Sequence, residues 1–216
     1  MGLKGPNPMH FVFDFGRVLF DWQPELLLQR LLPQHAFDAA SSAHWAAQVF
    51  QAYQGDWGDF DRGTVNPADL VQRIATRTGL APAEVQRVVD AVPQSLQPIP
   101  ASLGLLQRLR QPGRPMFFLS NMPAPYADHL EQQHAFVRQF DAGVFSGRVQ
   151  LIKPEPAIFA LAAQRFGVPA RQLLFLDDHR PNVVAARAAG WQALQFHDAA
   201  QAERDIRAAG WWPAAV

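Results

Sequence analysis

The sequence of 216 residues contains no cysteine, which excludes disulfide bridges and metal sites built on thiolates. Neither sign of charge is in excess, because 19 basic residues balance 19 acidic ones, so no overall field favours nucleic acid or an anionic membrane. No apolar run reaches the length of about 20 residues that a membrane-spanning helix needs. The first ten residues lack the apolar core of a signal peptide. We therefore expect a cytoplasmic protein that binds neither nucleic acid nor membrane.

Short apolar runs are present instead, and three of them end in polar side chains. These runs cover residues 11–13, 116–119 and 173–176, and segments with helical character separate them. The polar residues that follow the three runs are Asp14, the pair Ser120 and Asn121, and the pair Asp177 and Asp178. Alternating helices and buried strands predict an α/β fold with a mainly parallel sheet that is covered by helices on both faces. Because the carboxyl ends of parallel strands meet at one edge, we expect these polar residues to lie close together.

A second part of the chain, residues 23–97, has no strand pattern, and its sequence predicts an all-helical segment. Prolines at first-turn positions and glycines after the last turn mark several helices in it. The stretch 55–63, GDWGDFDRG, is rich in glycine and aspartate and is expected to be a loop. We therefore predict one unit formed by residues 1–22 and 98–216, with residues 23–97 inserted into it.

The polar residues at the predicted sheet edge suit phosphate chemistry. Three carboxylates that meet at one place repel one another, and Mg²⁺, which prefers oxygen ligands, would remove that conflict. Ser120 offers a hydroxyl, Asn121 offers a backbone N–H, and Lys153 offers a positive charge to phosphate oxygens. Together these are the parts needed for phosphoryl transfer through an aspartyl-phosphate.

Each of these residues also has a purely structural interpretation. Asp14 fits a turn that follows a strand, and the pair Asp177 and Asp178 fits the N-cap of a helix. Lys153 before a proline fits an ordinary surface position. No G-x-S-x-G surrounds Ser120, so a serine-hydrolase nucleophile is not indicated, and no H-E-x-x-H pattern indicates zinc.

Four stretches of the chain resemble, in order, the motifs of the haloacid dehalogenase-like hydrolases. They are FDFGRVLFD, FLSN, the lysine of LIKPEPAIF, and LFLDDHRPNVVAARAAG. The resemblance covers nearly the whole chain, and it implies a Rossmann-like, doubly wound core with an all-helical cap inserted after the first motif. The residues of the first and last motifs are also similar to those of the branch of this family that contains α-glucose-1-phosphate phosphatases.

The resemblance implies a role for each matching residue. Asp14 matches the nucleophile, and Lys153 matches the lysine that holds nucleophile and phosphate together. Ser120 and Asn121 match the residues that bind phosphate. The Mg²⁺ ligands are matched by Asp14, Asp178 and the carbonyl of Gly16, and Asp177 matches a residue that binds the ion directly or through water. Asn182 matches the position that supports the outer shell of the metal. Arg17 is unusual at its position, and it is expected either to reach the substrate phosphate or to brace the cap.

Gly16 departs from the family pattern, because most phosphatases of this family carry a second aspartate there. That residue protonates the leaving oxygen and later activates water, which is typically worth about 10² to 10⁴ in rate. The alternatives are a slower enzyme, a substrate with an easier leaving group such as a sugar 1-phosphate, or an acid from elsewhere. The candidates for such an acid are Asp21, His35, Asp61 and His179.

Three functions follow as hypotheses. The first is a Mg²⁺-dependent phosphatase for a small phosphorylated metabolite, with a hexose 1-phosphate favoured. The second is a 2-haloacid dehalogenase, which uses the same aspartate without a metal, and the pair Asp177 and Asp178 argues against it. The third is a non-catalytic or regulatory relative, which the missing acid at Gly16 allows.

Overall fold

The structure, a computed structural model, describes residues 9–213. Residues 1–8, which make up most of the stretch tested above for a signal peptide, lie outside the described residues. None of the helices within residues 9–213 is both long enough and apolar enough to cross a membrane.

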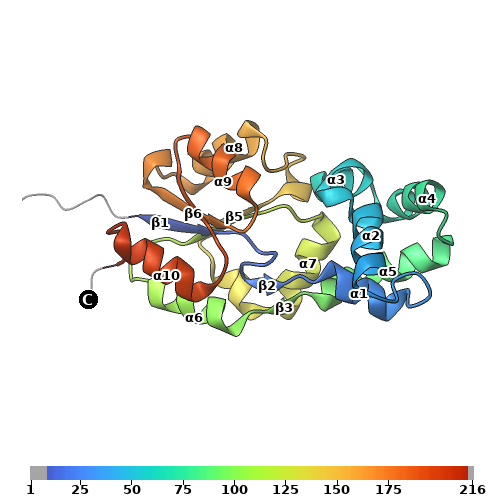
Figure 1. Cartoon of the computed structure of the whole chain (residues 1–216). Coiled ribbons are helices and arrows are strands. Elements are labelled where there is room, and N and C mark those ends of the chain that lie inside the picture. Colours follow the sequence, from blue (N-terminus) through green and yellow to red (C-terminus); the bar gives the residue numbers. More distant parts are fainter. Residues whose placement is uncertain (1–8, 214–216) are drawn as a thin grey trace, which may run out of the picture.

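A sheet of five parallel strands forms the centre of the fold (Figure 1). In spatial order its strands are β5 (Ala142–Phe145), β4 (Phe117–Ser120), β1 (His10–Phe13), β6 (Leu173–Asp177) and β7 (Gln192–Gln195). The strands β4 and β5 follow β1 on one side, whereas β6 and β7 lie on the other side. The order therefore reverses between β1 and β6, and ligands of open α/β sheets bind beyond the carboxyl ends of the strands at such a point.

Helices cover both faces of this sheet (Figure 1). They are α6 (Pro100–Leu109), α7 (Ala124–Gln133) and α10 (Ala199–Ala208) on one face, and α8 (Pro156–Phe166) and α9 (Arg180–Ala188) on the other. Short 3₁₀ turns lie at η2 (Ala135–Gln139), η3 (Ser146–Arg148) and η4 (Ala170–Gln172). Successive strand residues serve opposite faces, since Phe11 and Phe13 pack with α6 and α10 while Val12 packs with α8 and α9. The predicted doubly wound α/β fold is confirmed.

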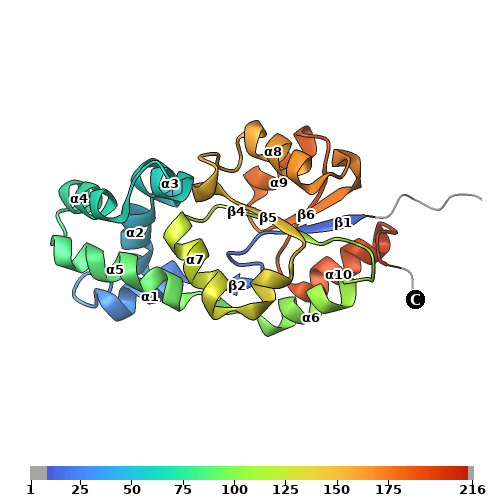
Figure 2. The same cartoon turned by 180° about the vertical axis from the view of Figure 1, so that it is seen from behind.

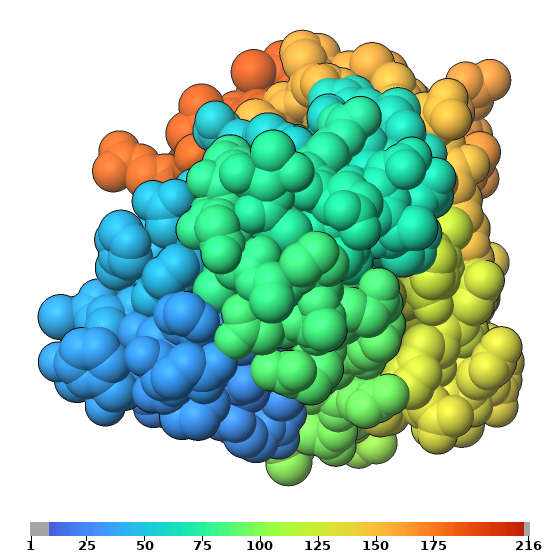
Figure 3. All heavy atoms as spheres, turned by 90° about the vertical axis from the view of Figure 1, so that its right-hand side faces the viewer, coloured from blue at the N-terminus to red at the C-terminus, as the bar shows by residue number. Residues whose placement is uncertain are grey.

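Residues 24–95 form a group of helices, here called the helical insert, at the carboxyl end of the sheet (Figure 1). Its elements are α1 (Pro24–Leu31), α2 (Ala39–Phe50), η1 (Gln51–Tyr53), α3 (Gly55–Arg62), α4 (Pro67–Thr78) and α5 (Pro82–Ser95). The chain enters and leaves it through an antiparallel pair, β2 (Phe20–Asp21) and β3 (Gln97–Pro98). Seen end-on, the insert covers most of that side of the molecule (Figure 3). From behind, α7 lies between the insert and the sheet (Figure 2), and its Tyr126 hydroxyl donates a 2.6 Å hydrogen bond to the Val89 carbonyl of α5.

The stretch 55–63 is helical, so the prediction of a loop there is wrong. It forms α3, which Gly63 ends with a φ of 83°. Glycine and aspartate have low helix propensity, but packing compensates for it. Trp57 and Phe60 are buried on one side of α3, and their rings meet those of Phe50 at 4.6 Å and Tyr126 at 5.3 Å. Tertiary contacts, which local sequence does not reveal, therefore decide the conformation of this segment.

Two smaller differences concern the end of the helical segment. The sequence from Pro82 predicts a helix that stops near Val92, before Pro93, but α5 continues through Pro93 to Ser95. The two-residue strand β3 lies at the edge of the segment expected to be entirely helical. A two-residue strand has no detectable periodicity of its own, because it forms only through its pairing with β2.

Candidate active site

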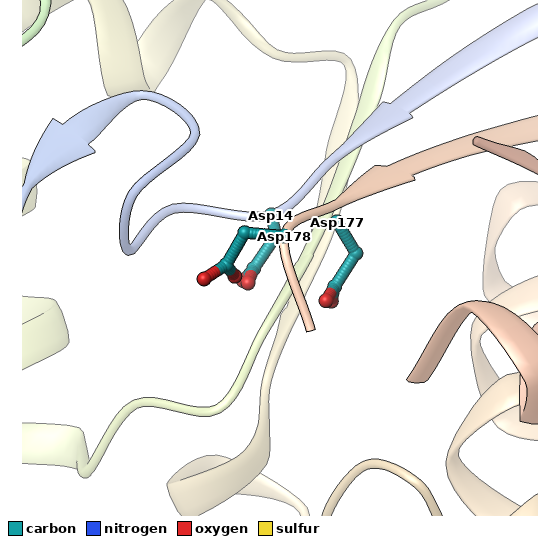
Figure 4. Close-up of side chains that lie close together, drawn as sticks. All are labelled: Asp14, Asp177 and Asp178. Atoms are coloured by element: carbon teal, nitrogen blue, oxygen red, sulfur yellow. The ribbon is translucent and has the colours of Figure 1, made fainter. Parts of the chain in front are cut away.

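Three aspartates converge at the carboxyl ends of β1 and β6 (Figure 4). Asp14 directly follows β1, Asp177 ends β6, and Asp178 is the next residue. The Asp14 amide donates to the Leu176 carbonyl at 2.9 Å, which fixes the register of the two strand ends. One carboxylate oxygen of each aspartate lies within 4.8 Å of one oxygen of each of the others. The structure thus brings together the acidic residues that the strand pattern predicts at this edge.

Lys153, in the loop before α8, lies buried beneath this cluster. Its Nζ lies 2.9 Å from Asp14 Oδ1 and 2.7 Å from Asp177 Oδ2, and it donates to the Leu119 carbonyl at 3.1 Å. The side chain is only 1% exposed, so this ammonium group is fixed between two carboxylates. An ordinary surface lysine is therefore excluded at this position.

Asn121 holds the backbone of Lys153 from the end of β4. Its Oδ1 accepts from the Lys153 amide at 2.9 Å, and its Nδ2 donates to the Lys153 carbonyl at 3.0 Å. The sequence suggested only the backbone N–H of Asn121 as a functional group. This use of the side chain was missed, since it depends on a residue that lies 32 positions further along the chain.

Asp177 is completely buried and accepts hydrogen bonds at both oxygens. Its donors are Lys153 Nζ, the His179 amide at 2.8 Å, and Asn182 Nδ2 at 3.1 and 3.0 Å. Asn182 Oδ1 is buried and has no hydrogen-bond partner within residues 9–213. Asp177 therefore orients Lys153 and is itself oriented by Asn182.

The electrostatic environment of the cluster favours an additional cation. Burial raises the pKa of Asp14 to about 7, Lys153 opposes this effect, and the charges of Asp177 and Asp178 add to it. Burial, together with Asp177, also raises the pKa of Asp178. Burial tends to lower the pKa of Lys153, but Asp14 and Asp177 outweigh it and raise that pKa. Three carboxyl groups at this spacing, with oxygen donors only, fit a hard divalent cation such as Mg²⁺.

A cavity of about 280 Å³ opens between the cluster and the helical insert. Its polar side contains the predicted site residues Asp14, Gly16, Arg17, Ser120, Asn121, Lys153, Asp178 and Asn182, while Asp177 is buried outside the lining. Most of the other lining residues are apolar or aromatic, although Gln54, Asp61 and His179 line the cavity as well. The larger apolar and aromatic ones, here called the apolar wall, are Trp22, Tyr53, Trp57, Val92, Leu96 and Tyr126. The cavity thus joins a charged end to an apolar wall.

Gly16 and Arg17, in the loop between β1 and β2, line this cavity. A Cβ placed on Gly16 would have no atom within 4 Å, so space exists where the family usually has an acid. Arg17 has a φ of 57° and its Nε donates to the Trp22 carbonyl at 3.3 Å. Arg17 thus contacts the chain entering the insert and also lines the cavity, so both predicted roles stay open.

The four candidates for a replacement acid differ in whether they line the cavity. Asp21 is exposed on β2 and accepts from Gln23 Nε2, and His35 pairs with Glu84 at 3.3 Å within the insert. Neither of them lines the cavity, whereas Asp61 and His179 do.

Comparison with known proteins agrees with this geometry. A profile of the haloacid dehalogenase-like hydrolase family matches residues 9–190. The chain is 26% identical over 197 residues to a sesquiterpene phosphatase of Aspergillus oryzae, and the match covers 91% of this chain and 93% of the relative. A HAD family enzyme of Bacteroides thetaiotaomicron, solved with magnesium and inorganic phosphate, is 18% identical with a TM-score of 0.68, over 89% of this chain and 96% of that one. The L-2-haloacid dehalogenase RSc1362 is 23% identical with a TM-score of 0.67, over 87% and 86% of the two chains. The chain belongs to the haloacid dehalogenase-like hydrolases, as its four motifs indicate.

Proposed function

We propose that this hydrolase is a Mg²⁺-dependent phosphatase that cleaves phosphate monoesters of small molecules through an aspartyl-phosphate on Asp14. The observation that carries the proposal is the pairing of Asp14 Oδ1 with the buried Lys153 Nζ, at the charged end of the cavity. The likeness to a sesquiterpene phosphatase along nearly the whole chain supports phosphate esters as substrates.

The residues around Asp14 have distinct tasks in this reaction. The Asp14 carboxylate attacks phosphorus, and Lys153 neutralises charge on the nucleophile and on the phosphate. Ser120 and the Asn121 amide bind phosphate oxygens at the end of β4. Water then hydrolyses the aspartyl-phosphate and restores Asp14.

Asp14, Asp178 and the carbonyl of Gly16 would hold Mg²⁺, with Asp177 and Asn182 behind them. The ion supplies positive charge that stabilises the phosphoryl group during transfer. Because Asp177 already accepts from three groups, its main task is to keep Lys153 in place.

The helical insert acts as a cap over the site, so that residues 23–97 form one unit and residues 1–22 and 98–216 form the catalytic core. Enclosure by the insert excludes water and selects substrates. The residues that line the cavity come from both units, which supports this division.

The apolar wall favours a phosphate ester of an apolar alcohol. Trp57 is 3% exposed and Tyr126 is 5% exposed, and Val92 and Leu96 extend the same wall. An apolar chain gains about 25 cal/mol for each Å² that it buries on such a surface, whereas sugar hydroxyls would lose hydrogen bonds to water there. The acyclic or cyclic hydrocarbon of a sesquiterpene alcohol has this character, in line with the relative from Aspergillus oryzae.

A hexose 1-phosphate is the second candidate substrate. It is favoured by Gly16, since an anomeric alcohol leaves more easily than an ordinary one and needs less help from an acid. The likeness to a haloacid dehalogenase at 23% identity shows the fold alone. The three clustered carboxyl groups favour a metal-dependent phosphatase over that activity.

A substrate panel tests the proposal. Phosphate release would be measured from a long-chain aliphatic monophosphate, glucose 1-phosphate and p-nitrophenyl phosphate, and chloride release from 2-chloropropionate. Each assay would be run with Mg²⁺ and with excess EDTA. We expect phosphate release that requires Mg²⁺ and is fastest with the aliphatic ester. Phosphate release that persists in EDTA would contradict the metal requirement, and chloride release without phosphate release would support a dehalogenase.

A further inference from the structure

At the position after β1 where this family usually carries its proton donor, this chain has no acidic side chain. Gly16 stands where such an acid would be, and the space beside it is open. An ordinary alkoxide is a poor leaving group, so its departure is slow without a proton donor. A donor that lines the cavity from another element would complete the site.

Asp61 lines the cavity from α3 of the helical insert. It follows Trp57 by four residues, so both side chains lie on the same face of the helix, and both face the cavity. Asp61 is 5% exposed. Within residues 9–213 no hydrogen bond or ion pair engages its carboxyl group, although nearly all buried polar groups in proteins have a partner. An unpaired, buried carboxyl group that faces a substrate cavity indicates a functional group.

The position of Asp61 is fixed by contacts between the insert and the core. Ser146 Oγ donates to the Asp61 carbonyl at 2.5 Å and accepts from the Met122 amide at 2.8 Å. The next residue, Arg62, forms a two-pronged ion pair with Glu155, with one contact at 2.8 Å. A Cβ on Gly63 would lie 2.3 Å from the Gly147 carbonyl, so the two backbones are in close contact. Three successive residues of the insert are thus docked on the core beside the site.

The surroundings of Asp61 favour the protonated form. Burial raises the pKa of Asp61 well above its ordinary value, the charge of Asp14 acts in the same direction, and that of Lys153 opposes it. A neutral carboxyl group can donate the proton that the leaving oxygen needs. His179, the other candidate in the cavity, is exposed, and its backbone amide is engaged by Asp177.

We propose that Asp61 is the general acid and base of this phosphatase, supplied by the insert in place of the acid that Gly16 lacks; the proposal rests on the proposed function. As Asp14 attacks and the bond between phosphorus and the ester oxygen breaks, the Asp61 proton passes to that oxygen, and the alcohol leaves neutral. The Asp61 carboxylate then takes a proton from water as the water oxygen attacks phosphorus. Inorganic phosphate and Asp14 are released, and Asp61 is protonated again.

The test compares two leaving groups in Asp61→Asn, assayed as kcat/KM with Mg²⁺. The p-nitrophenolate ion is stable without a proton at neutral pH, whereas the alkoxide of a long-chain aliphatic phosphate is not. We expect Asp61→Asn to lower kcat/KM for the aliphatic ester by about 10² to 10⁴-fold and to lower that for p-nitrophenyl phosphate far less. Asp59→Asn, on the same helix but half-exposed, is the matched control and should change neither rate.

Equal losses for both esters, or no loss for the aliphatic one, would overturn the assignment of Asp61. If His179→Gln shows the selective loss and Asp61→Asn does not, the acid is His179. Should Asp61→Asn fail to fold, the wild type answers the same question across a series of aryl phosphates: a shallow dependence of kcat/KM on the acidity of the leaving phenol supports an internal acid, and a steep one refutes it. A wild type that releases phosphate from neither of these esters nor from glucose 1-phosphate would refute the proposed function itself, and the assignment of Asp61 with it.

Discussion

Replacing Asp14 by asparagine should abolish phosphate release and, in the absence of Mg²⁺ near pH 8, increase the stability of the folded chain. Asp14 is 8% exposed and lies beside the carboxyl groups of Asp177 and Asp178. Asparagine removes the nucleophile and also one of three charges that repel one another. Lys153 keeps Asp177 and the Leu119 carbonyl as partners in the variant.

The size of this effect follows from the pKa of Asp14. Burial raises that pKa from 3.8 to about 7, and each tenfold change in proton affinity corresponds to about 1.4 kcal/mol. Ionised Asp14 therefore costs the folded chain about 4 kcal/mol, which is an upper limit for the gain from asparagine because Lys153 loses one contact. For a chain of this length, a change of 1 kcal/mol moves Tm by about 2 to 4 °C.

The difference in stability between Asp14→Asn and the wild type should depend on pH in a defined direction. Below about pH 4, Asp14 is protonated in both the folded and the unfolded chain, so wild type and Asp14→Asn should have similar stability. As the pH rises towards 7, the folded wild type must release a proton that it holds more tightly than the unfolded chain does. The stability of the wild type therefore falls relative to the variant, and the difference is complete above about pH 7.

Thermal unfolding of both proteins in EDTA, from about pH 4 to about pH 8, measures this difference. Addition of Mg²⁺ near pH 8 should raise the Tm of the wild type more than that of Asp14→Asn. A variant that is less stable than the wild type throughout this range would refute the idea that the site is electrostatically strained. A variant that still releases phosphate at the parental rate would show that Asp14 is not the nucleophile.

Three further substitutions separate the parts of the site. Lys153→Gln should stop turnover. Unlike Asp14→Asn, it should also destabilise the chain by about 3 to 5 kcal/mol, because two buried carboxylates lose their counter-charge. Unfolding in urea measures this loss, and an unchanged free energy of unfolding would contradict it. Asp178→Asn should raise the Mg²⁺ concentration for half-maximal phosphate release about tenfold or more, and an unchanged Mg²⁺ titration would exclude it as a ligand. Trp57→Ala should raise KM for a long-chain aliphatic phosphate about tenfold or more and leave KM for glucose 1-phosphate nearly unchanged; equal effects on both would contradict an apolar subsite.

The core of the site was predictable because topology determines it. The apolar runs that became β1, β4 and β6 are short and end in polar residues, and helices separate them. A parallel sheet then places those ends at one edge, whatever the details of packing. The register that sets Asp14 beside Asp177 is a direct consequence.

The residues that the insert places at the cavity were not predictable in the same way. The sequence indicated Asp61 together with three other groups, and only the docking of α3 on the core shows that Asp61 lines the cavity, as His179 does and Asp21 and His35 do not. The helix α3 itself was missed, since its glycines and aspartates favour a loop until Trp57 and Phe60 are packed. The reciprocal hydrogen bonds of Asn121 with Lys153 likewise join positions that are distant in sequence.

One helix was missed although the sequence contains its signals. The helix α10 begins after Asp198, whose side chain accepts from the Gln201 amide at 2.7 Å, and buries Ala199, Ala202 and Ile206 on one face. An N-cap followed by apolar residues three and four apart is the ordinary pattern of an amphipathic helix. Small alanine side chains make such a face inconspicuous in a chain rich in alanine.

Trp57 of the apolar wall and Asp61, the proposed proton donor, share one face of α3, which would link the choice of substrate to the rate of reaction. Both residues line the cavity. In the proposed reaction, Trp57 would contact the apolar part of the substrate, and Asp61, one turn later, would protonate the ester oxygen. A substrate that buries its chain against Trp57 would therefore also stabilise the position of α3 in which Asp61 can donate its proton. Binding energy from a remote part of a substrate can in this way increase the rate of the chemical step.

Phosphates of alcohols with progressively shorter chains should accordingly lose kcat as well as affinity. With Trp57→Ala the dependence of kcat on chain length should become weaker, because the contact that transmits it is gone. The measurement is kcat at saturating concentration for a series of linear alkyl phosphates, in the wild type and in the variant. If chain length changes KM alone in the wild type, the insert binds the substrate without increasing the rate of the chemical step. Substrate binding by Trp57 and proton transfer by Asp61 are then independent of each other.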